Sequence, residues 1–168
     1  QSGELVRRLG VFDNVINALA WLPDGGHLVV GLQGYSGLRV LRLKDGSVAA
    51  SDTQCQDDLM DMDVSRRGRI VTAALDGYIR IYDRNFKLIG RRAVPGGKKP
   101  VSVRFSPGGE EIAIGFLDVP AIAVASAQDL NLKYQVNTKN LSGQTGFTTV
   151  VWSSDGTALY GSGEHRGP

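Results

Sequence analysis

Residues 70–83 have the sequence IVTAALDGYIRIYD, in which two β-rich runs flank the turn dipeptide Asp76-Gly77. In the second run, Ile79 and Ile81 point to one face of a strand, and the residue after each points to the other. Period-two alternation beside an Asp-Gly turn is the strongest short-range signal of a β-hairpin. The stretch therefore predicts two antiparallel strands joined by a tight turn.

The hairpin belongs to a larger unit over residues 58–92. Residues 62–64 lead into a polar turn that ends at Gly68, and residues 86–92 form a fourth, more polar run. Charged side chains on such an outer strand discourage pairing with other chains at the sheet edge. We therefore expect one four-stranded antiparallel sheet from this unit.

The same pattern recurs along the chain. Each repeat places an apolar residue before a tight polar turn and a β-rich run, and these apolar residues are Trp21, Val64, Phe105 and Trp152. They are separated by 43, 41 and 47 residues. A period of about 40–45 residues with several short strands per repeat is typical of a β-propeller. No segment shows helical periodicity, so the sequence predicts an all-β protein.

The repeats also predict where each blade begins and ends. We expect four-stranded antiparallel blades, about 3.5 of them, which corresponds to half of a seven-bladed ring. The segments are an outer strand of a preceding blade over residues 1–10, blades over residues 15–52, 58–92 and 99–137, and an incomplete blade over residues 147–168.

Half a ring would leave apolar blade faces and a strand edge uncovered. We expect the remaining blades to come from the same, longer chain, and the absence of an initial methionine agrees with this. One alternative is a second copy of the chain that closes the ring through split blades. Another is an open β-repeat array that is not a propeller.

Composition narrows the class of protein. Apolar residues make up 42% of the chain and charged residues 21%, which is typical of a globular protein. The net charge of +2 argues against nucleic-acid binding, which uses a concentrated basic surface. No apolar stretch approaches the ~20 residues of a membrane helix, and the first residues do not resemble a signal peptide. Because Cys55 is the only cysteine, no disulfide can form within the chain, and we expect a cytoplasmic protein without membrane contact.

Three motifs resemble the WD-repeat propeller family. Residues 79–83, IRIYD, are similar to the strand that ends in Trp-Asp in that family, with Tyr82 in the tryptophan position. Residues 105–109, FSPGG, resemble its first turn, and Asp76 matches the acidic residue of its hairpin. The resemblance covers residues 5–163 and implies a ring of four-stranded blades that serves as an interaction scaffold.

The chain departs from this family in two ways. The Gly-His dipeptide that family members often carry before the first strand is absent from all four repeats, and so is Trp-Asp itself. We therefore expect Asp76 to lack the histidine partner that is typical of the family. The resemblance then implies a divergent member of bacterial type, of the kind that accompanies effector domains such as caspase-like proteases or NTPases.

Residues suited to catalysis are few. The only histidines are His27, after a tight turn, and His165, near the C-terminal end. No second cysteine or histidine cluster could bind a metal, and the neighbouring Asp57 and Asp58 are expected to raise the pKa of the Cys55 thiol. We therefore expect no catalytic residues, no metal and no cofactor.

Other charged motifs have structural explanations. The acidic run that includes Asp61 and Asp63 lacks the ligand spacing of a calcium loop and fits the edge of a blade. Residues 96–99, GGKK, precede proline and a strand rather than the helix of a phosphate loop. The arginines within residues 66–69 lie on a first turn and those at residues 91–92 on an outer strand, so they form no single nucleic-acid stripe.

A propeller brings two sets of loops together on one rim: those that precede the first strand of each blade and those that join its second and third strands. We expect this rim to bind a protein partner, because exposed aromatic residues mixed with charges are typical of interface hot spots. The candidate contact residues are Phe12, Tyr35, Asp57, Asp58, Tyr78, Lys98, Lys99, Asp118, Phe147 and His165. For Tyr78 and Phe147 the alternative is that they pack between blades.

The sequence thus predicts a non-catalytic propeller that serves as a protein-interaction scaffold or sensor within a larger protein. One alternative is a propeller enzyme, such as a hydrolase or lyase, with its site at the central channel, although the inner strands carry mainly apolar or small residues. Another is a propeller that binds a sugar or another small ligand, for which Tyr35 and Tyr78 are a partial match.

Overall fold

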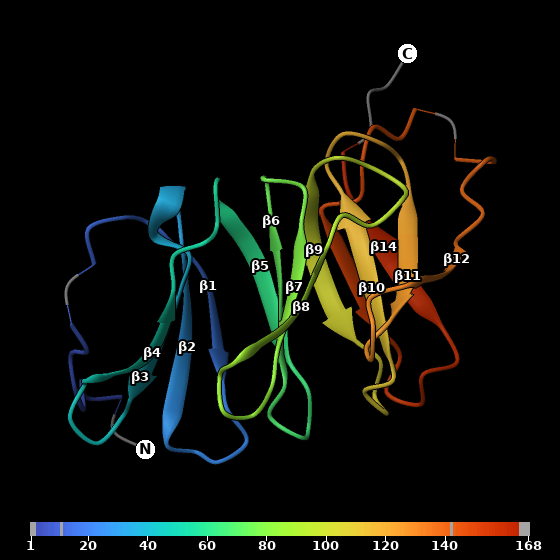
Figure 1. The fold of residues 1–168 in the computed structure, drawn as a ribbon. Helices are drawn as coiled ribbons and strands as arrows, with labels where there is room; N and C mark the ends of the chain where they lie inside the picture. The colour runs from blue at the N-terminus through green and yellow to red at the C-terminus, as the bar shows by residue number, and fades with distance from the viewer. Residues whose placement is uncertain (1–2, 11, 142, 165–168) are drawn as a thin grey trace.

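The chain folds into short antiparallel sheets that follow one another along the sequence (Figure 1). The computed structural model describes residues 3–10, 12–141 and 143–164. Sheet 1 contains β1 (Ile16–Trp21), β2 (His27–Leu32), β3 (Leu38–Arg42) and β4 (Val48–Asp52), and sheet 2 contains β5 (Leu59–Val64), β6 (Ile70–Ala74), β7 (Ile79–Tyr82) and β8 (Leu88–Arg92). Sheet 3 contains β9 (Pro100–Phe105), β10 (Glu111–Phe116), β11 (Ile122–Ser126) and β12 (Leu132–Gln135), and sheet 4 contains β13 (Thr149–Trp152) and β14 (Leu159–Ser162). The all-β fold of repeated four-stranded sheets is confirmed.

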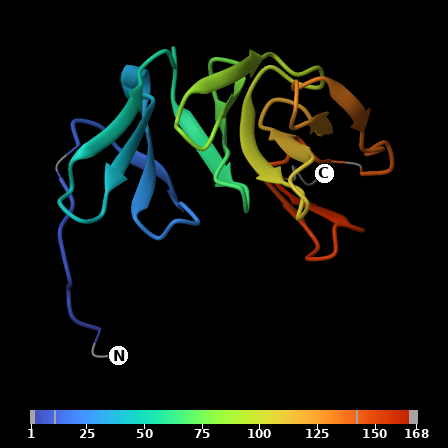
Figure 2. The ribbon, with the colours of Figure 1, turned by 60° about the horizontal axis from the view of Figure 1, so that its bottom comes forward.

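The sheets are arranged as the blades of a partial propeller. Each strand pairs with the next one in the chain, so each four-stranded sheet is a simple meander. The first strands lie next to one another, because β1 contacts β5, β5 contacts β9, and β9 contacts β13. Figure 2 shows that the described strands do not close into a ring.

The hydrophobic core lies between the sheets. Ile79 and Ile81 of β7 face sheet 3, where they pack in one cluster with Ile114 of β10. Tyr82 points to the other face of β7 and packs with Val40 of sheet 1. The alternation predicted for β7 is therefore confirmed, and sheet 2 contributes both of its faces to the core.

The four predicted tight turns are structurally equivalent. The glycine at the end of each has a positive φ: 66° at Gly25, 78° at Gly68, 83° at Gly109 and 74° at Gly156. The amide of each glycine also donates a hydrogen bond to a backbone carbonyl three residues earlier. Glycine suits these positions because other residues are strained at positive φ. The repeated turns therefore give each blade the same first hairpin.

The N-terminal segment differs from the expected outer strand. Residues 3–10 form no strand. Arg7 donates from Nη1 to the carbonyl oxygen of Leu43 (2.7 Å) and to that of Lys44, and Leu9 packs against the cluster of sheet 1 that contains Val30. A strand forms beside a neighbouring strand that completes its hydrogen-bond ladder, and among the described residues none of the strands of the four sheets lies in this segment. Their place in a preceding blade stays a prediction.

Candidate functional site

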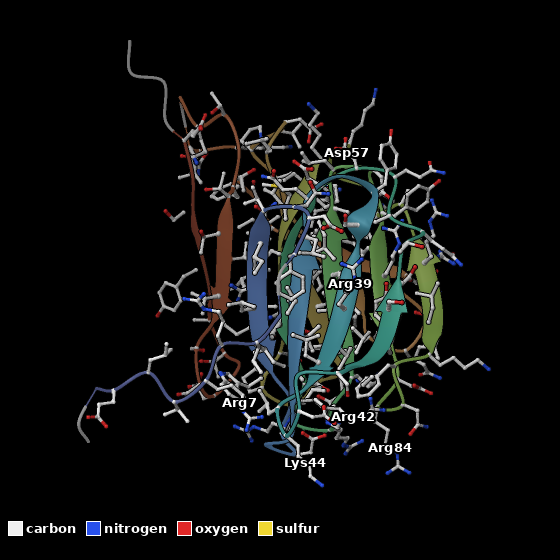
Figure 3. The ribbon with its side chains drawn as sticks, turned by 90° about the vertical axis from the view of Figure 1, so that its left-hand side faces the viewer. Arg7, Arg39, Arg42, Lys44, Asp57 and Arg84 are labelled. Atoms are coloured by element: carbon white, nitrogen blue, oxygen red, sulfur yellow. The ribbon has the colours of Figure 1, made fainter. Side chains whose placement is uncertain are left out.

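Two sets of loops lie on one rim of the molecule, which we call the upper rim. They are the loops that precede the first strands of sheets 2 to 4 and the loops that join the second and third strands of sheets 1 to 3. Figure 3 shows Asp57 at this end and Arg84 at the opposite end, the lower rim. Seven predicted contact residues lie on these loops with at least partly exposed side chains: Tyr35, Asp57, Asp58, Tyr78, Lys98, Lys99 and Asp118.

The other three predicted contacts are placed differently. Phe147 is only 4% exposed and packs with Val150 in the core between sheets 3 and 4. It is therefore a core residue, because the loop before β13 turns its ring inward. Phe12 is half-buried and packs beside Leu9 against sheet 1. His165 lies outside the described residues.

Asp118 holds the loop before β9 in place. Its carboxylate accepts hydrogen bonds from the backbone amides of Lys98 (2.9 Å) and Lys99 (3.0 Å). Burial alone would raise the pKa of Asp118, but these two amide hydrogen bonds outweigh it and lower the pKa below its usual value. Asp118 therefore fixes the backbone of both lysines and leaves their side chains exposed.

Asp58 connects the loops of two neighbouring sheets. Its Oδ1 accepts a hydrogen bond from the amide of Gly34 (2.6 Å), at the start of the short 3-10 helix η1 (Gly34–Ser36) in sheet 1. Its backbone carbonyl accepts another from the amide of Leu75 (2.9 Å), in sheet 2. Asp57 beside it is exposed. Asp58 therefore has a structural role, whereas Asp57 accepts a hydrogen bond from the amide of Asp58 at its Oδ1 (2.8 Å) and keeps an exposed side chain.

Asp76 has a partner other than histidine. Arg80, on the same hairpin, donates from Nη1 to Asp76 Oδ1 (3.1 Å) and from Nη2 to Oδ2. The same Nη2 donates to the carbonyl oxygen of Gln54 (3.1 Å). The side chains of the pair are only 2% and 3% exposed. Arg80 thus joins the hairpin of sheet 2 to the loop before β5.

The pKa of Asp76 reflects this arrangement. Burial alone would raise it, but the hydrogen bonds from Arg80 and from the amides of Gln56 and Tyr78 outweigh burial and lower the pKa. A carboxylate that three groups stabilise in its charged form is part of the folded framework. Asp76 therefore stabilises the upper rim rather than contacting a ligand.

Two tyrosines on the rim differ in freedom. Tyr35 lies on η1 and is 75% exposed. Tyr78 is half-buried, and the guanidinium carbon of Arg91 lies 3.8 Å from the centre of its ring. A cation at this distance over an aromatic face is attracted to it. Tyr35 is thus free to contact a partner, whereas Tyr78 is partly engaged within sheet 2.

Stability is expected to fall as the pH drops below about 4. The pKa values of Asp76 and Asp118 are lowered from 3.8 in the folded chain, so their contribution is present above 3.8 and is lost as the pH falls through the folded pKa. Asp63 acts in the opposite direction, because burial raises its pKa. Urea unfolding at about pH 6 and about pH 3 measures the net loss. We expect Asp76→Asn to reduce this pH dependence; an unchanged dependence would contradict the assignment.

Carboxylates also join the inner strands on the channel side. Asp61 of β5 accepts hydrogen bonds from the amides of Met62 (2.9 Å) and Val103 (3.0 Å), and Asp63 accepts them from Val64 (2.8 Å) and Phe105 (2.8 Å). Each carboxylate therefore bridges the free edges of β5 and β9, where unpaired amides would otherwise remain. The predicted blade-edge role agrees with this arrangement.

The channel side is more polar than the sequence predicts. Arg104 of β9, which forms an ion pair with Asp61, does not fit the expectation of apolar or small inner strands. Ser102 fits it, and its Oγ accepts a hydrogen bond from the amide of Val150 (3.1 Å). Strand alternation places both side chains on the face of β9 opposite Val103 and Phe105, which pack in the core between sheets 2 and 3. A hollow of about 300 Å³ beside them is lined partly by Asp61, Ser102, Arg104 and Thr149.

Groups suited to catalysis are engaged elsewhere. His27 Nδ1 lies 2.7 Å from Asp24 Oδ2 on an exposed turn of the lower rim. Burial is the main cause that raises the pKa of the Cys55 thiol, and the charges of Asp76 and Asp52 raise it further. The sequence predicts this effect for Asp57 and Asp58 instead. The backbone carbonyl of Asp57 accepts a hydrogen bond from the thiol and lowers its pKa. Among the described residues, no group of three metal-binding side chains is arranged to hold an ion.

The fold defines the class of this chain, a propeller-like β-repeat protein. No known protein-family model matches the chain, and no curated protein matches its sequence. In the described ranges, none of the helical segments has the length and apolar character that a membrane crossing requires.

Proposed function

We propose that the chain is a non-catalytic module that binds a protein partner through its upper rim. The observation that carries this proposal is the fixed backbone of the rim loops. Asp58, Asp76 and Asp118 each tie loops of the rim together, while the side chains of Tyr35 and Lys98 stay exposed. A surface that is ordered before binding loses less conformational entropy on association. Tyrosine is among the residues most often found at interface hot spots.

We further propose that the module is a divergent WD-repeat propeller. Asp76 lies on the hairpin of sheet 2 and contacts the loop before β5, as the acidic residue of that family is expected to do. Arg80 then replaces the family's histidine as the buried partner of this carboxylate. The remaining blades would come from the same longer protein or from a second copy, and the assembly would act in the cytoplasm as a scaffold or sensor.

A small-ligand or enzymatic site at the channel has less support. The hollow beside β5 and β9 does contain Asp61 and Arg104. The carboxylate of Asp61, however, already accepts hydrogen bonds from two backbone amides, the Ser102 hydroxyl and Arg104. These hydrogen bonds favour a role for Asp61 in holding the strands together rather than in general acid or base catalysis.

Tyr35→Ala and the double variant Lys98→Glu, Lys99→Glu are expected to weaken partner capture about tenfold or more, because aromatic and charged anchors dominate interfaces. The measurement is affinity capture from cell lysate with quantitative mass spectrometry. Lys44→Glu is the matched control, since Lys44 is exposed at the lower rim (Figure 3). The proposal fails if the rim variants retain the partners of the unmodified chain while remaining folded by circular dichroism.

A further inference from the structure

The lower rim carries a cluster of arginines between sheets 2 and 3. Arg67 lies in the first turn of sheet 2, Arg69 follows this turn, and Arg84 lies on the turn between β7 and β8. The two turns are close, since a Cβ at Gly68 would lie 3.7 Å from the Cβ of Arg84. Arg84 is 15 and 17 residues from Arg69 and Arg67 in the sequence, so spacing alone does not reveal that it joins them.

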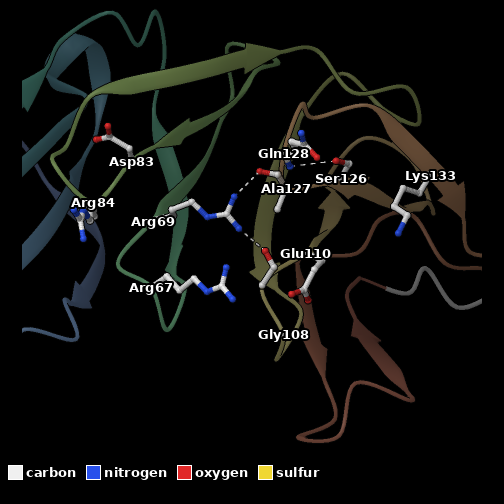
Figure 4. Close-up of a pocket in the computed structure, with 11 residues that line it drawn as sticks. Arg67, Arg69, Asp83, Arg84, Gly108, Glu110, Ser126, Ala127, Gln128 and Lys133 are labelled. Atoms are coloured by element: carbon white, nitrogen blue, oxygen red, sulfur yellow. Dashed lines mark hydrogen bonds between the residues drawn. The ribbon is translucent and has the colours of Figure 1, made fainter.

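These arginines line a hollow of about 930 Å³ (Figure 4). Its other charged residues are Lys133, Asp83 and Glu110. A second hollow of about 360 Å³, towards sheet 1, shares Arg67 and Arg84 with the first. The two arginines therefore stand between adjoining hollows that together extend across three sheets.

Arg69 is held in place without neutralisation of its charge. Its Nη1 donates to the carbonyl oxygen of Ala127 (2.9 Å) and its Nη2 to that of Gly109, as the dashed lines in Figure 4 show. Its guanidinium also lies 5.6 Å from the ring centre of Phe105. These partners are neutral groups, so Arg69 presents a fixed positive charge to the hollow.

The neighbouring cations differ in how far they are compensated. Arg67 and Arg84 are exposed and form no ion pair or hydrogen bond within the described residues. Lys133 forms an ion pair with Glu111, which does not line the hollow. With Lys133 paired to Glu111, the three arginines still outnumber the two carboxylates that line the hollow, which leaves an excess of positive charge. Such a concave surface concentrates anions.

We propose that this hollow binds a phosphorylated serine or threonine on an extended segment of a protein partner. A phosphate monoester carries nearly two negative charges and three acceptor oxygens, which match the forked donors of Arg67 and Arg84. The adjoining hollow would hold the residues that flank the phosphate. Asp83 and Glu110 on the walls disfavour a polyanion such as RNA, which needs a continuous basic surface. The site lies on the rim opposite the proposed partner surface and does not depend on it.

The test is an NMR titration of the ¹⁵N-labelled chain with the peptide Ac-Gly-Ala-phosphoSer-Ala-Gly-NH₂ at constant ionic strength. The unphosphorylated peptide, inorganic phosphate and oligo-uridylate are titrated in parallel. We expect the phosphopeptide to bind at least about tenfold more tightly than the unphosphorylated peptide, with shifts at residues 66–69, 83–85 and 108–110. Upper-rim residues 34–36 should not shift.

Arginine variants distinguish binding in the hollow from nonspecific attraction to the positive charge of the chain. Arg67→Ala and Arg84→Ala are each expected to weaken phosphopeptide binding about tenfold, since hydrogen bonds to charged groups are the strong ones. Arg8→Ala, which removes an exposed arginine outside the hollow, should leave it unchanged. Arg69 stays intact because it joins sheets 2 and 3. Equal binding of both peptides would overturn the proposal. Binding of inorganic phosphate as tight as that of the phosphopeptide would also overturn it. Tighter binding of oligo-uridylate than of the phosphopeptide, at equal phosphate concentration, would do the same.

Discussion

Arg80→Met is expected to lower the free energy of unfolding by about 3–5 kcal/mol, the range found when one partner of a buried ion pair is removed. The substitution leaves the carboxylate of Asp76 buried without its cation, and it also frees the carbonyl oxygen of Gln54. The loop before β5 would lose its connection to the hairpin of sheet 2. Chemical denaturation at neutral pH measures the change in the unfolding midpoint.

A double-mutant cycle isolates the pair. Asp76→Asn combined with Arg80→Met should restore part of the lost stability, because no unpaired charge remains buried. Arg66→Met is the matched control, since Arg66 is exposed on the first turn of sheet 2 and its loss should cost less than about 1 kcal/mol. A loss below about 1 kcal/mol in Arg80→Met would contradict the structural role of the pair.

The double variant Asp61→Ala, Asp63→Ala is expected to cost about 2–4 kcal/mol, because buried donors left unpaired cost about 1–3 kcal/mol each and water at the channel side offsets part of this. The two carboxylates hold the edges of β5 and β9 together. Amide hydrogen exchange should accelerate at Val103 and Phe105, whose amides lose their acceptors. The amide of Ile112 in β10 should change less.

Asp13→Ala provides the comparison for this second result. Asp13 is an exposed carboxylate in the loop before β1, and its removal should leave stability within about 0.5 kcal/mol. Unchanged exchange at Val103 and Phe105 in the double variant would show that the carboxylates do not protect the strand edges.

The repeats were predictable because local chemistry dictates them. A glycine at positive φ ends each of the four first turns, and the alternation of Ile79 and Ile81 sets the faces of β7. Each of these signals, the turn glycine and the strand alternation, involves only residues that are close together in the sequence. Local patterns of this kind depend little on the rest of the fold.

At two turns, tertiary packing outweighs the local preference for glycine at a positive φ. Phe86 and Leu130 have positive φ values of 67° and 58° at the turn before the outer strand, where sheet 1 has Gly46. Leu130 is 1% exposed within the core between sheets 2 and 3. Burial of the side chain compensates for backbone strain, and this compensation appears only once the sheets are packed.

The candidate site was predictable in position but not in role. Placement on one rim follows from the order of strands, and Tyr35, Lys98 and Lys99 are exposed there. The ties made by Asp58 and Asp118 depend on contacts over 24 and 20 residues, which a single sequence does not specify. The pairing of Asp76 with Arg80 could have been predicted from the sequence, since both residues lie on one hairpin.

The most direct test of the partner-binding rim is site-specific photo-cross-linking. The photoreactive residue p-benzoylphenylalanine would replace Tyr35 on the upper rim or, as a control, Tyr134 on the outer strand β12, where the side chain is 44% exposed. After irradiation in cell lysate, we predict a discrete covalent product with a protein partner from position 35 and none from position 134. Equal products from both positions, or a product from position 134 alone, would contradict the proposal that the upper rim binds the partner.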